Sequence, residues 1–324
     1  MEPYMPPFDA VAAKREKREI RLLGTMSGGA ILLYILLQNV LVTGLMLLGL
    51  YEAYSTQPLM QAGVDILLVL GCLLLPFLLM SKGMARVSGV RDPLMLDRAR
   101  SRSDFLLAIP AGVGFCVLAN AVSGYLITFL ESLGLELSSP DLPLPDGLFG
   151  VTVAFFRVVV VAAMVEELSF RGVVMGHLRR YGDGFAIVMA SLVFAMMHCN
   201  LIQAPFALIV GLALGYLSIR TGTLWTGILI HAVNNTVSLV FTYLMTVMSE
   251  QAAGLLYTIV TDGMLLVGGI CFLILLFRRP RGAARVRTEN GFGAKTLAFF
   301  LNPTMIPALA LIVWFTAKFV DTAG

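Results

Sequence analysis

Stretches of 18 or more mainly apolar residues recur along this chain of 324 residues. Each stretch is long enough to cross a hydrocarbon layer of about 30 Å as a helix. Charged residues make up only 13% of the chain, whereas a soluble domain has about 25%. One apolar segment alone would not account for so low a fraction. The sequence therefore predicts an all-α, polytopic bundle of transmembrane helices.

Nine apolar segments are predicted to give about eight or nine spans. Pro303 and Pro307 fall in the last segment and would kink a helix there, so that segment is predicted either to span or to end in the membrane plane or in a re-entrant turn. No cleavable signal peptide is evident, and the first segment is predicted to be a retained span. In chain order the segments are 24–50, 63–80, 105–130, 148–168, 184–199, 203–219, 223–247, 255–277 and 296–319.

The connecting segments alternate between basic and non-basic. By the positive-inside rule the basic segments are cytoplasmic, which places the N-terminus in the cytoplasm of what we expect to be a bacterial plasma membrane. The acidic segment 131–147, with Asp141 and Asp146 near its end, then lies outside. The predicted cytoplasmic segments are 1–22, 81–104, 169–183, 220–222 and 278–295, the last with the basic run 278–287.

Four parts of the chain follow from this pattern. Residues 1–22 form a basic cytoplasmic N-terminus, and 23–104 hold two transmembrane helices and a basic loop. Residues 105–250 hold most of the polar groups that fall inside spans, and 251–324 hold C-terminal helices with the basic loop 278–295.

The densest group of ionisable residues in a span is the run Glu166, Glu167 and Arg171. Charged residues inside a membrane are costly and are by default candidates for a functional site. Glu167 and Arg171 are four residues apart, so they share a helix face and are expected to form an ion pair. Glu166 lies about 100° further around the helix and is predicted to be free to face another group. Taken alone, this cluster could equally be a salt bridge at the cytoplasmic end of a helix.

Two histidines lie at a similar predicted depth. Glu166 is 16 residues before the turn at Gly182 and His198 is 16 residues after it. His231 and Asn235, four residues apart on one helix face, follow the next basic turn by about 9 to 13 residues, or roughly 14 to 20 Å. We therefore expect the four side chains to meet in one layer that is open toward the cytoplasm.

These residue types suit the hydrolysis of an amide by activated water. A free carboxylate beside a neutral imidazole can act as general base on a water molecule. A second imidazole with an Asn one turn away supplies N–H donors for a developing oxyanion. No covalent intermediate is required.

The motifs Glu-Glu-x-x-x-Arg (166–171), Phe-x-x-x-His (194–198) and His-x-x-x-Asn (231–235) resemble those of the CPBP family of intramembrane proteases. This family includes the type II CAAX prenyl endopeptidases and the bacterial Abi, or bacteriocin-immunity-type, proteins. The resemblance covers about residues 105–250. It implies that Glu166 and His198 activate the water, that His231 and Asn235 form the oxyanion site, and that Glu167 and Arg171 support the site, with the catalytic residues on spans 4, 5 and 7.

The resemblance leaves the cofactor open, because the family has been described both as metal-dependent and as a metal-free glutamate-type protease. Metal-free catalysis is favoured here, since no His-Glu-x-x-His is present and a His-x-x-x-Asn pair suits hydrogen bonding. If a metal such as zinc were used, Glu166, His198 and His231 would be its ligands. The expected partners are membrane lipid and a peptide or protein substrate, prenylated or membrane-embedded, with no nucleic acid.

Two other functions remain open. A non-catalytic membrane immunity or binding protein could use the same scaffold. A proton-coupled transporter could use a Glu/His site, although no convincing internal repeat is present.

Other polar groups receive structural interpretations. His177 is predicted to be at the surface or interface beside Arg179, and Arg157 to pair internally or line a cavity. Asp65 and Asp262 are predicted to be solvated at outer helix ends. The cysteines are predicted to be small buried side chains rather than disulfide partners; they are Cys72, Cys116, Cys199 and Cys271.

Overall fold

The computed structural model of the chain describes residues 9–139, 147–278, 286 and 288–322. Asp141 and Asp146 of the predicted acidic loop, and most of the predicted basic run 278–287, lie outside the described residues.

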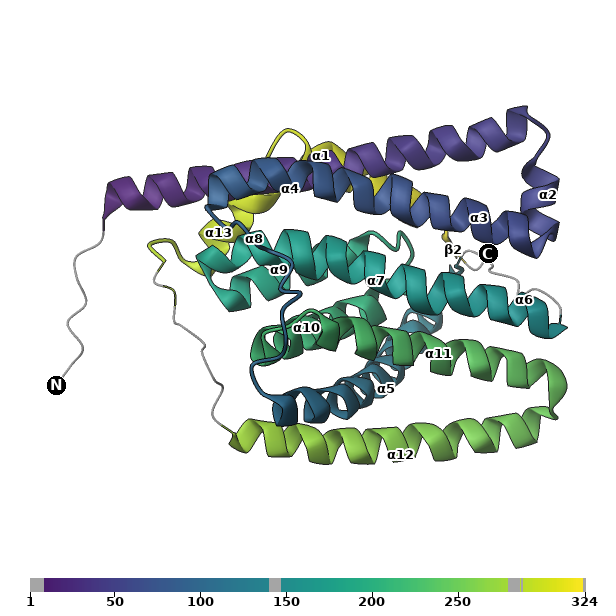
Figure 1. Cartoon of the computed structure of the whole chain (residues 1–324). Coiled ribbons are helices and arrows are strands. Elements are labelled where there is room, and N and C mark those ends of the chain that lie inside the picture. The colour runs from purple at the N-terminus through teal and green to yellow at the C-terminus, as the bar shows by residue number, and fades with distance from the viewer. Residues whose placement is uncertain (1–8, 140–146, 279–285, 287, 323–324) are drawn as a thin grey trace.

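The described chain is almost entirely helical, as predicted (Figure 1). The helices run roughly alongside one another, and one short antiparallel pair of strands, β1 (Leu135–Leu137) and β2 (Val320–Thr322), joins Leu137 to Val320. The other elements, in chain order, are α1 (Ala10–Leu47), α2 (Tyr51–Thr56), α3 (Pro58–Leu67), η1 (Leu68–Leu74), α4 (Leu75–Ser88), α5 (Arg102–Ser132), α6 (Gly147–Ala154), η2 (Phe155–Ala162), α7 (Ala163–Glu166), η3 (Glu167–Met175), α8 (Gly176–Leu178), η4 (Arg179–Tyr181), α9 (Asp183–Met196), α10 (Ala204–Thr221), α11 (Trp225–Val247), α12 (Glu250–Phe277), α13 (Phe292–Phe300) and α14 (Met305–Ala317).

Within the described residues, seven helical stretches are long and apolar enough to cross a membrane, and a bent pair would make an eighth. The bent pair is α13 with α14, which meet at 80° around Pro303, so the predicted kink is confirmed. Asn302 stabilises the break, because its Oδ1 accepts hydrogen bonds from the backbone N–H groups of Thr304 and Met305. The seven stretches are Ala10–Leu47, Pro58–Ser88, Arg102–Ser132, Gly147–Tyr181, Ala204–Thr221, Trp225–Val247 and Glu250–Phe277.

The helix that carries Glu166 is longer than predicted. We expected a span over 148–168 and a cytoplasmic loop over 169–183, but one continuous helical stretch runs from Gly147 to Tyr181, and Ser169–Met175 are all buried. The prediction of a loop is wrong because this segment is mainly small and apolar and packs in the core. The turn comes at Gly182, whose φ of 113° favours glycine.

The predicted span 184–199 is a short helix instead. α9 has 14 residues and α10 has 18, so each is roughly 21 to 27 Å long at about 1.5 Å per residue. The turn between them, residues 197–203, is sunk into the protein, and Asn200 within it is only 1% exposed. This α9–α10 hairpin therefore ends partway through the bundle and places His198 at its tip.

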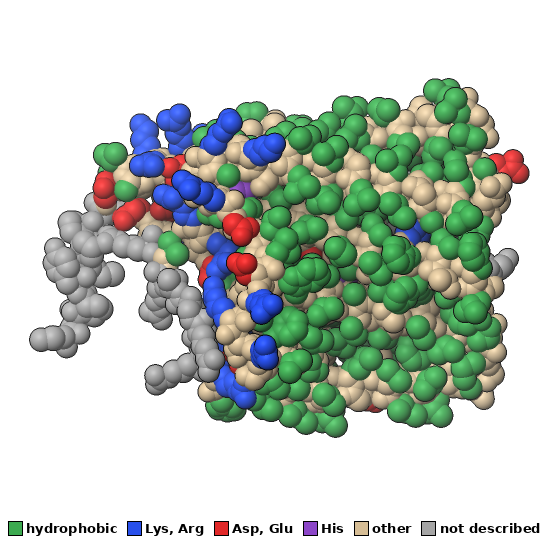
Figure 2. Space-filling view, viewed as in Figure 1, with side chains coloured by type: hydrophobic (Ala, Val, Ile, Leu, Met, Phe, Trp, Pro, Cys, Tyr) green, Lys and Arg blue, Asp and Glu red, His purple; other side chains and the backbone are tan. Residues whose placement is uncertain are grey.

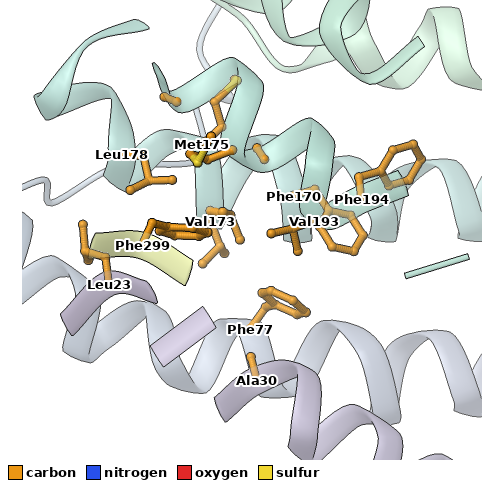
Figure 3. Close-up of a cluster of buried hydrophobic side chains, with 14 of the residues drawn as sticks. Leu23, Ala30, Phe77, Phe170, Val173, Met175, Leu178, Val193, Phe194 and Phe299 are labelled. Carbon is orange, nitrogen blue, oxygen red and sulfur yellow. The ribbon is translucent and has the colours of Figure 1, made fainter. Parts of the chain in front are cut away.

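The main core joins the N-terminal helices to the α9 hairpin. Figure 3 shows Phe77 of α4 pointing toward Phe170 of η3, with Ala30 of α1 below it. The rings of Phe77 and Phe170 lie 5.4 Å apart, and those of Phe170 and Phe194 lie 5.2 Å apart. Burial of these side chains fixes η3 and α9 against α1 and α4.

Charged side chains gather at one end of the bundle. Figure 2 shows Lys and Arg side chains around the beginning of α1 and the loop 89–101, whereas hydrophobic side chains cover most of the remaining visible face. The basic end and the apolar wall agree with a chain that lies across a bilayer.

Two predictions for polar side chains are wrong. His177 is not at the surface but completely buried, because Ser81 and Ser88, one on each side of the ring, lie 3.0 Å from its Nε2 and Nδ1. Asp65 is not solvated but forms an ion pair with Arg157 and accepts a hydrogen bond of 3.0 Å from Tyr54. The predicted internal pairing of Arg157 is thereby confirmed.

Asp262 is exposed, as predicted. The four cysteines are free; Cys72 and Cys116 are buried, and Cys199 and Cys271 are partly buried.

Candidate active site

Glu166 lies in the middle of the long helix Gly147–Tyr181, between two π-helical segments. It ends α7, with η2 before it and η3 after it. Such wider turns are rare in proteins and frequently occur at functional sites. The Glu166 side chain is 23% exposed and lines a cavity of about 950 Å³.

His198 follows α9 in the turn at the hairpin tip. We expected it on a fifth span, but α9 is too short to be one. Its Nδ1 lies 2.9 Å from the backbone oxygen of Phe194. A carbonyl oxygen can only accept, so Nδ1 is the protonated nitrogen. In the neutral ring Nε2 is then left as an acceptor.

Glu167 and Arg171 form the predicted ion pair, at 3.0 Å between Oε1 and Nη1. Both side chains are essentially inaccessible, at 0% and 1% exposure. The same Glu167 Oε1 lies 3.1 Å from Nδ1 of His231. Glu167 therefore joins the long helix to α11 and orients the His231 ring, a link the sequence did not show.

His231 lies between two carboxylates. Its Nδ1 faces Glu167, and its Nε2 lies 3.8 Å from Oε2 of Glu166. Two glycines leave space for these charged side chains. A Cβ on Gly227 would lie 2.8 Å from Glu167 Oε2, and a Cβ on Gly211 would lie 3.2 Å from Arg171 Nη2. Helices α10 and α11 can thus approach η3 closely enough to bury the charges.

Asn235 lies one turn after His231 on α11, and its amide nitrogen donates a hydrogen bond of 2.9 Å to the backbone oxygen of Val158. A side-chain amide has two N–H groups, so a second donor remains. Its Oδ1 accepts a hydrogen bond of 3.3 Å from Asn234. The two amides are therefore held in fixed orientations beside the cavity.

One cavity of about 950 Å³ is lined by all four predicted catalytic residues, Glu166, His198, His231 and Asn235. Its walls come from the long helix, the hairpin tip, α5, α11 and α12. The remainder of the lining is mostly apolar, with Asn120, Asn234, Gln203, Ser238, Thr242 and Tyr257 as further polar members. Pockets that bind ligands have this character, an apolar wall with a few convergent polar groups.

The cavity extends away from the basic end, which differs from the predicted opening toward it. Its lining runs along α11 from His231 to Met245, or about 21 Å at about 1.5 Å per residue. Side chains of the core, such as Val173 and Met175, fill the basic side. The short α9–α10 hairpin leaves the space on the other side.

Phe194, which the sequence showed only as part of a motif, lies between several side chains of the site. Its ring centroid lies 4.9 Å from that of His198 and 6.3 Å from that of His231. The Arg171 guanidinium carbon lies 4.1 Å from the same centroid. One aromatic side chain thus contacts both imidazoles and the supporting cation, and its backbone oxygen holds His198.

Sequence reasoning also missed Asn234 and Tyr34. The doublet Asn234-Asn235 was a visible signal, but the choice between its members required the helix orientation. Tyr34 lies on α1, far from the motifs, and lines a second small cavity with Glu166 and His198. No local pattern could have indicated this proximity.

The three side chains named as ligands for a possible metal do not converge on one point. Among the described residues, no group of three or more His, Cys, Asp and Glu is placed to hold a metal ion. Glu166 and His231 instead face one another at 3.8 Å, and His231 and His198 each use Nδ1 for a protein contact.

One of three comparisons with known proteins gave a match. Neither the curated proteins nor the solved structures gave a match. The family model described as "Type II CAAX prenyl endopeptidase Rce1-like" matches residues 148–237, a segment that lies within the range 105–250 covered by the predicted resemblance and contains all three motifs. The match confirms the resemblance drawn from the motifs: residues 148–237 are similar to the Rce1-like type II CAAX prenyl endopeptidases. Together with the apolar helices, it supports an integral membrane protein.

Proposed function

We propose that this protein is an intramembrane endopeptidase that hydrolyses a peptide bond with water activated by Glu166 and His198. The observation that carries the proposal is that Glu166, His198, His231 and Asn235 line one cavity, although they come from three separate parts of the chain. The family supports the assignment as a hydrolase of membrane-associated peptides.

The water oxygen bonds to the carbonyl carbon of the peptide, and Glu166 accepts a proton from the water at the same time. Nε2 of His198 accepts a hydrogen bond from the same water. It is free to accept because Nδ1 carries the proton and donates to the Phe194 oxygen. The tetrahedral intermediate then collapses, the C–N bond breaks, and the proton passes from Glu166 to the leaving nitrogen. General acid–base steps of this kind contribute about 10²- to 10⁴-fold to rate.

His231 and Asn235 stabilise the negative charge on the carbonyl oxygen of the intermediate. For His231 this requires a proton on Nε2 as well as on Nδ1, which donates to Glu167. Glu166 and Glu167 flank the ring and are balanced by one guanidinium, that of Arg171, so a protonated His231 would complete the charge balance. Asn235 offers its second amide N–H.

Catalysis without a metal ion is part of this proposal. It is supported by His231, whose two nitrogens face carboxylates at distances and positions suited to hydrogen bonding and charge pairing rather than to shared ligation. Full activity after dialysis against a strong chelator would agree, and activity that is lost and then restored by zinc would contradict it.

The test is cleavage of a farnesylated CAAX peptide carrying a fluorophore and a quencher, and of the same peptide without farnesyl, by the purified full chain in detergent. Glu166→Gln keeps the shape and removes the base, so kcat should fall about 10²-fold or more. Glu131→Gln, at an exposed position of α5, is the matched control and should cleave like the wild type.

Equal cleavage by the wild type and Glu166→Gln would contradict the proposal. Saturable binding of the peptide without cleavage by the wild type would favour the alternative of a non-catalytic binding protein. A difference between the two peptides would show whether the prenyl group is recognised.

A further inference from the structure

A second, smaller cavity lies on the other side of the Glu166–His198 pair. It has a volume of about 110 Å³. Three of its lining residues, Glu166, Phe194 and His198, also line the large cavity. The others are Tyr34, Leu73, Phe170 and Met197.

The small cavity is built partly by helices outside the family segment 148–237. Tyr34 comes from α1 and Leu73 from η1, and both belong to or pack against the main core. The Phe170 ring, held between Phe77 and Phe194 (Figure 3), forms a wall. The N-terminal helices therefore supply part of the surroundings of Glu166.

This cavity is the right size and polarity for water and is too small for a peptide. A volume of about 110 Å³ has room for a few water molecules, and a buried water typically needs two to four polar partners. Glu166, His198 and Tyr34 provide three. The Tyr34 hydroxyl makes no hydrogen bond with the described residues, and Tyr34 lines this cavity together with Glu166 and His198.

We propose that the small cavity holds the hydrolytic water, and that Tyr34 is a positioning residue that donates a hydrogen bond to it. The inference rests on the proposed peptidase function. Water has two protons and two lone pairs. Glu166 and Nε2 of His198 accept the protons, Tyr34 donates to one lone pair, and the other lone pair faces the substrate carbonyl in the large cavity.

Separate places for water and substrate explain why both cavities are lined by Glu166 and His198. The substrate occupies the large, mostly apolar cavity with His231 and Asn235. The water is bound in the small cavity and attacks the substrate carbonyl from between Glu166 and His198. The O–H bond that breaks sends its proton to Glu166, so no further reactant is needed.

Two variants test the inference with the reporter peptides described above. Tyr34→Phe keeps the ring and removes the donor. It should lower kcat roughly tenfold, as expected for one hydrogen bond to a reacting water, and leave KM unchanged. The matched control Tyr125→Phe, at a position 80% exposed on α5, should leave kcat and KM unchanged.

Leu73→Phe enlarges a lining side chain and fills the small cavity without entering the large one. It should also lower kcat at constant KM, whereas Leu78→Phe, at a position 38% exposed on α4, should not. The solvent deuterium isotope effect on kcat should change in Tyr34→Phe and Leu73→Phe, which a merely structural role of these residues would not produce.

A third measurement does not depend on turnover. Hydroxyl-radical footprinting by X-ray radiolysis oxidises side chains beside bound water, so Tyr34 should be modified in the wild type and protected in Leu73→Phe. An unmodified Tyr34 in the wild type would overturn the inference.

The kinetic outcomes separate the two proposals. An unchanged kcat in Tyr34→Phe, with or without a raised KM, would overturn the assignment of the water to the small cavity. The proposed peptidase function would still stand if Glu166→Gln were inactive. Full activity of Glu166→Gln would overturn both.

Discussion

At the scale of residues, the site depends on charges that are buried together. Glu167 carries two contacts on one oxygen, with Arg171 at 3.0 Å and His231 at 3.1 Å. Neither Glu167 nor Arg171 has appreciable contact with solvent. Removal of one partner of such a pair leaves an uncompensated charge in the interior.

Arg171→Met should therefore destabilise the protein strongly, by about 3–5 kcal/mol, with a large fall in Tm measured in detergent. The double variant Glu167→Gln with Arg171→Met removes both charges and should recover much of the loss. Arg15→Met breaks an exposed pair with Glu19 and should leave Tm unchanged. A single Arg171→Met variant as stable as the wild type would contradict this account of the cluster.

At the scale of elements, three helices approach one another closely enough to enclose the ion pair. Gly211 of α10 and Gly227 of α11 stand where a side chain would meet Arg171 or Glu167. Small residues at such positions allow helix backbones to pack closely within a membrane. The positions of His231 and Asn235 depend on this packing because both are on α11.

Gly227→Ala should push α11 away from η3, because the added Cβ would lie 2.8 Å from Glu167 Oε2 and 2.9 Å from Ser218 Oγ. We expect kcat for the reporter peptide to fall at least tenfold and Tm to decrease. Gly263→Ala on α12 is the matched control, since a Cβ there meets nothing within 4 Å, and a helical Gly→Ala change in open space is neutral or stabilising. Equal activity of the two variants would argue against a close-packed α11.

At the scale of the whole molecule, the distribution of charge orients the bundle. Lys and Arg side chains gather at one end (Figure 2), where the loop 89–101 and the turn at Gly182 lie. Glu136, the exposed residue of strand β1, lies beyond the C-terminal end of α5. The positive-inside rule predicts that the basic end is cytoplasmic.

Single cysteines should report this orientation after the four native cysteines are replaced by alanine. In intact bacterial cells expressing the chain, a membrane-impermeant maleimide should label Glu136→Cys but not Arg91→Cys, and permeabilisation should expose Arg91→Cys. Both positions are exposed in the structure. Labelling of Arg91→Cys in intact cells would reverse the orientation.

The sequence by itself determined the class of the protein and the identity of the polar cluster. Apolar length and low charge require helices across a membrane whatever the packing, and Glu166, Glu167 and Arg171 are conspicuous because charge in a span is costly. The Glu167–Arg171 pair followed from helix periodicity alone, as did the separation of Glu166 from it. These are local properties, and the structure agrees with them.

Only the tertiary structure decided which distant groups meet. Asp65 pairs with Arg157, and His177 lies between Ser81 and Ser88, across gaps of about 90 residues that no sequence period spans. The C-terminal end of the long helix, which is at Tyr181, was misplaced because burial in the core, rather than hydropathy, sets where it stops. The direction of the large cavity and the presence of Tyr34 and Glu166 around one small cavity likewise come from packing between helices, which depends on side-chain shape over the whole bundle.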